Sequence, residues 1–258
     1  MQTLRAQRVL ATRRGSSWPV LVDTGERKLV LKLRGTAEGV RALIAEVVVG
    51  ALADALGLAT PERYLVELPP QLPSDDPHEE LRDLLERSAG YNLGLRYLEG
   101  FRNVTVADAA RIKPELAASI VWLDAFTLNP DRSSANPNLM IKAGQIWLID
   151  HGAALGFQHD WRSVTEQTPR EPGAFVAAHL LRVTEAELRR ADAALAPKIS
   201  RDTLEAALAE VPDDFFVALG GERPARQRAA YVAFLKKRLH APRPFVAPGK
   251  NEPFQFGR

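Results

Sequence analysis

The sequence of 258 residues contains no cysteine, and this absence excludes several kinds of chemistry. Without thiols the chain has no disulfide bond, no thiolate nucleophile and no cysteine–zinc site. The five histidines are not spaced like the ligands of a zinc site. A metal ion bound to this protein must therefore be held by oxygen atoms or by histidines, and oxygen atoms are the ligands that hard cations prefer.

Long apolar segments are also missing. No apolar run approaches the roughly 20 residues that a membrane-spanning helix needs. The basic N-terminal segment MQTLRAQRVLATRRG lacks the apolar stretch of a secretory signal peptide. We therefore expect a cytoplasmic protein with no membrane span.

Neither sign of charge is in large excess, because the formal net charge is only +2. Basic residues nevertheless dominate 1–34 and 221–258, whereas acidic residues dominate 74–88. Proteins that bind single-stranded nucleic acid combine basic residues with aromatic side chains on which the bases stack, and the basic segments lack that combination. We interpret these segments as solvated surface and expect no nucleic-acid partner.

Alternating apolar residues and turn-forming residues predict a β-rich first part of the chain. Four prolines within 69–78 exclude a regular element there. In chain order, the expected elements are strands 4–13, 18–23 and 28–34, a helix over 37–56, a strand over 63–68, a helix over 79–88 and a strand over 91–99.

The second part of the chain is predicted to be mainly helical. Pro114 is a favoured first-turn residue and opens an apolar helix over 115–127, after which a polar loop covers 129–138. The remaining expected elements are strands 139–142 and 145–150, joined at Ala143-Gly144, and helices 174–182, 185–195, 201–210 and 224–240.

Three oxygen-bearing side chains mark the junction between the apolar helix and the hairpin. Asp131 and Asn136 lie on the polar loop, and Asp150 ends the second strand of the hairpin. An enzyme that transfers a phosphoryl group from a nucleotide needs a carboxylate to orient the attacking hydroxyl and accept its proton. It also needs oxygen ligands for Mg²⁺, and an amide and a carboxylate suit that ion. A turn-capping role remains the alternative for Asp131.

This pattern resembles a kinase catalytic loop followed by an Asp-Phe-Gly segment. The matching residues are Asp131, Asn136, Asp150 and Gly152, whereas His151 stands in the place of phenylalanine. The loop Asn129-Pro130-Asp131-Arg132-Ser133-Ser134-Ala135-Asn136-Pro137-Asn138-Leu139 is similar to that of HipA-like kinases and, more distantly, to phosphoinositide kinases.

The resemblance extends to the first part of the chain and covers roughly residues 5–160. Lys32 lies in the strand KLVLKLRG, where the family places the lysine that binds the nucleotide phosphates, and Glu46 lies where its acidic partner is expected. Ser16 and Ser17 lie where a loop would cover the phosphates. Alternatives remain: Lys32 shares a strand face with Lys28 and could face solvent, Glu46 could be a surface acid, and the serines could form a plain turn.

The resemblance implies an α+β, two-lobed protein-kinase-like fold. Its small antiparallel β-sheet lobe carries one helix and lies against a larger, mainly helical lobe. We expect a nucleotide-binding lobe with its linker over 1–90, a catalytic lobe over 91–240 and an irregular basic tail over 241–258. The chain starts at the small lobe, so we expect no additional N-terminal module of the kind that HipA toxins carry, which does not favour a toxin–antitoxin role.

The implied activity is transfer of the γ-phosphoryl group of ATP to a hydroxyl, with Mg²⁺ as cofactor and a protein serine or threonine as the leading acceptor. Asp131 would be the catalytic base, Asn136 and Asp150 the metal ligands, and Lys32, held by Glu46, the phosphate clamp. A small-molecule or lipid-headgroup kinase of the same fold, a nucleotide-binding pseudokinase scaffold and nucleotidyl transfer remain alternatives.

Overall fold

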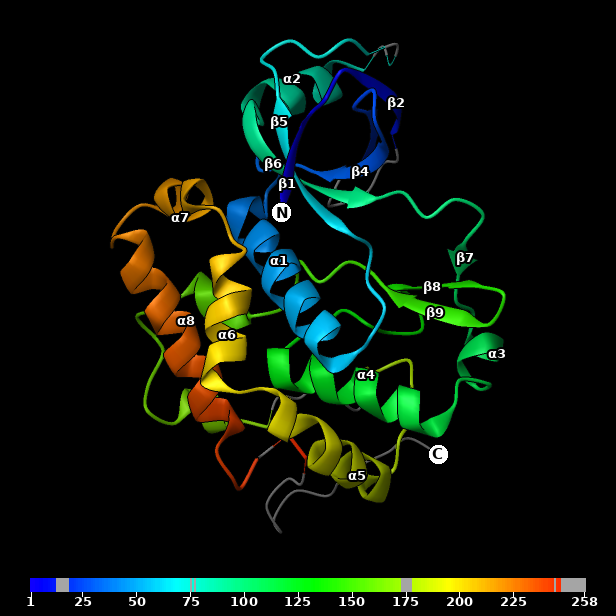
Figure 1. The fold of residues 1–258 in the computed structure, drawn as a ribbon, viewed down its shortest axis with the longest axis vertical. Helices are drawn as coiled ribbons and strands as arrows, with labels where there is room; N and C mark the ends of the chain where they lie inside the picture. Colours follow the sequence, from blue (N-terminus) through cyan, green and yellow to red (C-terminus); the bar gives the residue numbers. More distant parts are fainter. Residues whose placement is uncertain (13–18, 75, 77, 173–177, 244, 247–258) are drawn as a thin grey trace.

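The computed structural model describes residues 1–12, 19–74, 76, 78–172, 178–243 and 245–246. Figure 1 shows a β-rich lobe above a larger lobe that holds most of the helices. In chain order the elements are β1 (Gln2–Arg5), β2 (Arg8–Thr12), β3 (Val20–Asp23), β4 (Lys28–Lys32), α1 (Gly39–Leu56), β5 (Arg63–Leu68), α2 (Glu79–Arg87), β6 (Gly90–Arg96), β7 (Arg102–Asn103), α3 (Val106–Ala109), α4 (Pro114–Thr127), β8 (Leu139–Lys142), β9 (Gln145–Leu148), η1 (Gly156–His159), η2 (Thr168–Arg170), α5 (Glu185–Leu195), η4 (Ala196–Lys198), α6 (Arg201–Ala209), α7 (Asp213–Leu219) and α8 (Pro224–Leu239). In the described part of the chain, none of these helices is long and apolar enough to span a bilayer.

The small lobe is built on a six-stranded sheet with the order β1-β5-β6-β4-β3-β2. Strands β1 and β2 lie at opposite edges, although only Ala6 and Gln7 separate them in sequence. The Ala6 amide donates to Glu67 O at 3.0 Å, and the Gln7 amide donates to Asp23 O at 2.8 Å, so the two edges meet at this point. The sheet must therefore curl round on itself, as Figure 1 shows.

The sheet differs from the sequence-based expectation in three ways. The strand expected over 4–13 is split at Ala6 and Gln7, and β1 pairs with β5 in parallel, whereas the other pairs are antiparallel. Strand β6, which we expected to open the large lobe, pairs with both β4 and β5. This pairing supports a boundary between the lobes after Arg96, and we propose that boundary in place of residue 90.

Helix α1 lies between the sheet and the helices of the large lobe. It is apolar on all sides, as expected of a helix that is packed all round. Its side chains belong to a core cluster that includes Leu93 and Leu95 of β6 together with residues of α4 and α6. Helix α2 covers the other apolar cluster of the sheet with Leu81, Leu84 and Leu85. Helix α1 therefore joins the two lobes, and α2 is a second helix of the small lobe.

Helix α4 forms the centre of the large lobe, and a buried arginine holds its C-terminal end. Arg238 of α8 donates to Phe126 O at 3.0 Å, Ala125 O at 2.8 Å, Pro169 O at 3.0 Å and Glu171 O at 2.7 Å. Burial lowers the pKa of Arg238 to about 10, so the side chain remains charged at neutral pH. The arginine thus fixes the end of the helix from which the loop with Asp131 emerges.

The expected irregular tail over 241–258 is only partly described. Phe245 is buried and its ring lies 5.8 Å from that of Trp122 and 6.1 Å from that of Phe126, so this part of the tail packs on α4. Residues 247–258 lie outside the described residues.

Replacing Arg238 by Met should destabilise the protein strongly, because four carbonyl groups would lose their donor inside the large lobe. We expect the free energy of unfolding to fall by about 3 kcal/mol or more. Lys236→Met, at an exposed position on the same helix, should change it by no more than about 0.5 kcal/mol. Urea unfolding measures both values, and equal stabilities for the two variants would contradict the role given to Arg238.

Candidate active site

Lys32, at the end of β4, lies between two carboxylates. Its Nζ is 2.6 Å from Asp150 Oδ1 and 3.1 Å from Glu46 Oε1. The lysine is 9% exposed, so it does not face bulk solvent as strand alternation allowed. The contact with Asp150 is a hydrogen bond, whereas the contact with Glu46 is an ion pair whose angles lie outside those of a hydrogen bond.

Glu46 connects Lys32 to the segment that follows β9. It is 3% exposed on α1, and its Oε2 accepts a hydrogen bond from the His151 amide at 3.0 Å. It is therefore not a surface acid. One buried carboxylate thus contacts both the lysine of the small lobe and the backbone next to Asp150.

Two opposing effects set the pKa of Lys32. Burial lowers it, because the charged form loses its hydration, but the negative charges of Glu46 and Asp150 and the hydrogen bond to Asp150 raise it further. The net result is a pKa above that of a free lysine. Lys32 is therefore a permanent cation at the end of the β-sheet, suited to holding an anionic group.

Asp131 lies on the loop after α4, and two asparagine amides hold it. Asn136 Nδ2 donates to both carboxylate oxygens of Asp131, at 2.9 and 2.8 Å. Asn138 Nδ2 donates to Asp131 O at 2.6 Å and to Oδ2 at 3.1 Å. These contacts fix the orientation of the carboxylate. They use the amide nitrogen of Asn136, so its side-chain carbonyl oxygen is not engaged by Asp131.

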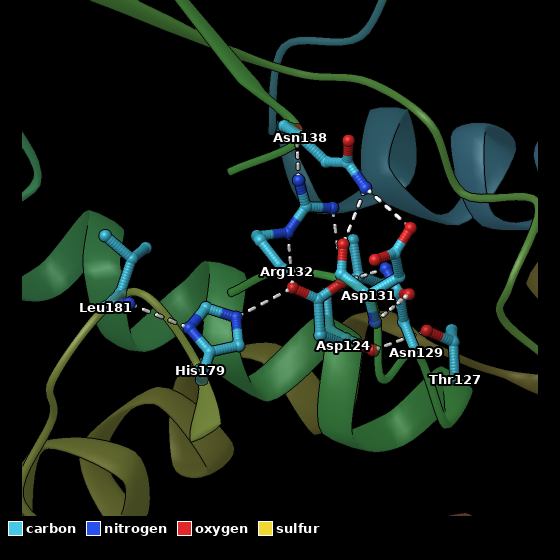
Figure 2. A network of polar contacts seen from close by, with 9 residues as sticks. Asp124, Thr127, Asn129, Asp131, Arg132, Asn138, His179 and Leu181 are labelled. Carbon is cyan, nitrogen blue, oxygen red and sulfur yellow. Dashed lines mark hydrogen bonds and ion pairs between the residues drawn. The ribbon is translucent and has the colours of Figure 1, made fainter. Parts of the chain in front are cut away.

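A buried network anchors this loop to α4 (Figure 2). Arg132 Nε donates to Asp124 Oδ2 at 2.6 Å, and neither side chain has exposed surface. Asn129 Nδ2 donates to Asp124 Oδ1 at 2.8 Å. Burial alone would raise the pKa of Asp124, but Arg132 and His179 outweigh it and hold the pKa well below its usual range. Asp124 is therefore an anion inside the protein, fully paired.

His179 completes the network in a defined tautomer. Its Nδ1 accepts a hydrogen bond from the Leu181 amide at 2.9 Å, so in the neutral ring Nε2 carries the proton. That Nε2 lies 3.0 Å from Asp124 Oδ2 and donates to it. The Leu180 amide donates to Arg132 O at 2.8 Å. The helix expected over 174–182 is wrong in its described part, residues 178–182, because these backbone amides bind the loop and the histidine instead.

One residue connects the two halves of the site. The carbonyl oxygen of Asn138 accepts hydrogen bonds from Arg132 Nη1 and, at 3.1 Å, from the Ile149 amide. Ile149 precedes Asp150, whose φ of 56° is in the left-handed region that few residues other than glycine adopt. Strain of this kind clusters at functional sites, and here it occurs at the carboxylate that contacts Lys32.

The structure thus brings together most of the residues that the sequence indicated. Lys32, Glu46 and Asp150 form one cluster, Asp131 and Asn136 form a second, and Asn138 links them. Ser16 and Ser17 lie outside the described residues. Sequence reasoning missed Asp124, Arg132 and His179 as supports of the loop; the one signal for them was a charged residue inside the apolar run IVWLDAF.

Comparisons with known proteins address the family and the fold of the chain. The sequence model that describes HipA-like kinases matches residues 12–222, which is more than half of the chain. The protein belongs to the HipA-like kinase family. Among solved structures, this HipA-like kinase is similar to the crystal structure of a Helicobacter pylori proinflammatory kinase, CtkA, with a TM-score of 0.52 and 10% identity over 92% of this chain and 98% of the other. That likeness shows a shared kinase-like fold. None of the curated proteins matches the sequence.

The histidine of the Asp150-His151-Gly152 segment is a buried titratable residue of this HipA-like kinase. His151 is 3% exposed, and within the described part of the chain neither ring nitrogen has a hydrogen-bond partner. Burial, with the positive charge of Arg132, lowers its pKa to about 3. The ring is therefore neutral at physiological pH and occupies the position of the phenylalanine in the kinase motif.

Because of His151, the free energy of unfolding of this HipA-like kinase should decrease as the pH is lowered below neutral. The unfolded chain binds a proton at this histidine below about pH 6.5, whereas the folded protein does so only near pH 3. Between pH 7.5 and 5, wild type should therefore lose about 2 kcal/mol more stability than His151→Phe. Urea unfolding at the two pH values measures this difference.

The matched control is His159→Phe at an exposed histidine, which should keep the pH dependence of wild type. Identical pH dependence in wild type and His151→Phe would show that His151 is protonated as easily in the folded protein as in the unfolded chain.

Proposed function

We propose that this protein transfers the γ-phosphoryl group of ATP, with Mg²⁺, to the hydroxyl of a protein serine or threonine. The observation that carries the proposal is the arrangement of Lys32, Glu46 and Asp150 beside the loop that holds Asp131. A buried, doubly paired lysine and a carboxylate fixed by two amides are the parts that phosphoryl transfer requires. Membership of a kinase family supports the same reaction class.

Lys32 would bind the phosphates of ATP. In the structure its charge is shared between Asp150 and the buried Glu46. A nucleotide that enters would offer further negative charge to Lys32, while Glu46 would remain in place because α1 buries it. The lysine would then exchange its contact with Asp150 for the phosphates, and the ion pair with Glu46 would keep it oriented.

Asp150 and Asn136 fit a hard divalent cation by the chemistry of their donors. Asp150 uses one carboxylate oxygen for Lys32, and its side chain is 32% exposed. Asn136 is exposed and uses its amide nitrogen for Asp131. Mg²⁺ is usually held by one or two protein oxygens together with phosphates and waters. No cluster of three histidine, aspartate or glutamate side chains suited to a metal occurs in the described residues, which agrees with a cation shared with the substrate. When bound, Mg²⁺ would neutralise charge on the phosphates.

Asp131 would orient the acceptor hydroxyl. The hydroxyl oxygen attacks the γ-phosphorus, the bond from that phosphorus to the bridging oxygen breaks, and ADP leaves with the electron pair. The hydroxyl proton passes to the Asp131 carboxylate, which Asn136 and Asn138 hold in one orientation. A protein acceptor rests on the resemblance to HipA-like kinases, which phosphorylate protein serine.

Labelled ATP tests the proposed reaction. Wild type should transfer label from [γ-³²P]ATP to its own hydroxyls or to dephosphorylated casein, and should transfer none from [α-³²P]ATP. Asp131→Asn should reduce the transfer at least about 100-fold, because general base catalysis is lost. The exposed Asp202→Asn should leave the rate unchanged.

Each other outcome assigns a different function. Label transferred from the α position would show nucleotidyl transfer. Label found only in small molecules or lipids would replace the protein acceptor. Full activity of Asp131→Asn would remove this residue from the mechanism.

Nucleotide binding should depend on Lys32 and on a divalent cation. At a hundredfold excess over Kd a ligand adds about 2.7 kcal/mol of stability, which for a chain of this size raises Tm by about 5–10 °C. Wild type and Lys28→Met, an exposed lysine on the same strand, should show this rise with ATP and Mg²⁺ together. Lys32→Met should show little rise relative to its own baseline.

Excess chelator should abolish the rise in wild type, because the negative charges of ATP and Asp150 then repel each other. An equal rise for Lys32→Met and Lys28→Met would contradict the phosphate-binding role.

A further inference from the structure

We propose that Asn138 is a positioning residue that sets the orientation of Asp131 for phosphoryl transfer; this rests on the proposed function. Asn138 contacts Asp131 twice, since its amide donates to the backbone oxygen at 2.6 Å and to Oδ2 at 3.1 Å. The two contacts fix the backbone and the side chain of Asp131 relative to each other. The carboxylate therefore cannot rotate without losing a hydrogen bond to Asn138.

The position of Asn138 itself is fixed from the other side. Its carbonyl oxygen accepts from Arg132 Nη1, and Arg132 is anchored by the buried Asp124. The same oxygen accepts from the Ile149 amide at 3.1 Å, next to Asp150. A displacement of Asn138 would therefore change the position of Asp131 relative to Asp150. This separation decides whether the acceptor hydroxyl and the phosphate meet in line.

Asn136 and Asn138 differ in what they can contact. Asn136 is exposed, so its carbonyl oxygen is open to a cation or a nucleotide. Asn138 is 7% exposed, and its amide nitrogen is used by Asp131. Through these hydrogen bonds it would act on the reaction by way of Asp131. The asparagine at 136 can leave Asp131 when a ligand binds, whereas the asparagine at 138 keeps the carboxylate in place.

The backbone of Asn138 allows an informative substitution. Its φ is 46°, in the left-handed region, where asparagine is tolerated and glycine is unstrained. Asn138→Gly therefore removes the amide without imposing backbone strain. Asn138→Asp keeps the size of the side chain but replaces the donor by a carboxylate next to that of Asp131. The two variants change the same hydrogen bonds by different means.

The test compares wild type, Asn138→Gly and Asn138→Asp. For each protein, kcat and KM for ATP are measured with [γ-³²P]ATP and dephosphorylated casein, and the rise in Tm is measured with ATP and Mg²⁺. We expect kcat to fall at least 10-fold in Asn138→Gly and further in Asn138→Asp. KM for ATP should stay within threefold of wild type, and the rise in Tm should be retained. A loss of kcat with retained ATP binding separates positioning from general loss of structure.

The control is Asn92→Ala. Asn92 is a buried asparagine of β6. Its amide donates to Ser88 O and Gly90 O and not to Asp131. It should lower Tm with kcat within twofold of wild type. If both Asn138 variants keep kcat within twofold of wild type, or lose kcat and ATP binding together, Asn138 is not a positioning residue. If wild type itself transfers no phosphate and shows no rise in Tm, the proposed function has failed instead.

Discussion

Arg132 and Asp124 form an ion pair without exposed surface on either side chain, and the arrangement of the site depends on it. The pair joins the loop of Asp131 to helix α4, and Asn129 and His179 satisfy further oxygen positions of the same carboxylate. Removing one member of such a pair leaves an uncompensated buried charge and costs about 3–5 kcal/mol. The ion pair therefore stabilises the loop only when both Arg132 and Asp124 are present.

The half of the site around Lys32 is organised by a different rule. Lys32 is a single cation between two carboxylates, one buried and one partly exposed. The buried Glu46 is fixed by helix α1, so Asp150 is the partner that can be exchanged. The site thus combines a rigid half, in which every group is paired inside the protein, with a half in which one ion pair is accessible to ligands.

The sequence predicted the local features well. The sequence pattern singled out Asp131, Asn136 and Asp150; the structure places the first two in contact and ties the residue before Asp150 to the same loop through Asn138. The role of α1 was less accessible, because a helix that is apolar on all sides does not reveal which lobe it packs on. His179 and Arg238 were missed because their partners are distant in sequence. Asp124 was missed because it lies inside an apolar helix, although Asn129 and Arg132 follow it closely in the chain. Strand β6 was expected in the large lobe, and its pairing with β4 and β5 could not be foreseen because strand pairing is not encoded locally. The bend at Ala6 and Gln7 has no turn-forming residue to mark it.

Helix α1 belongs to the apolar cluster of the large lobe, whereas most of the curled sheet packs in a separate cluster with α2. Regions with separate cores can open at different free energies, and hydrogen exchange then reports them as separate units. The ion pair from Lys32 to Glu46 crosses between such units. Partial unfolding of the sheet would therefore remove the lysine from the site and leave the glutamate in place, so the affinity for nucleotide would follow the local stability of the small lobe and not the global stability of the chain.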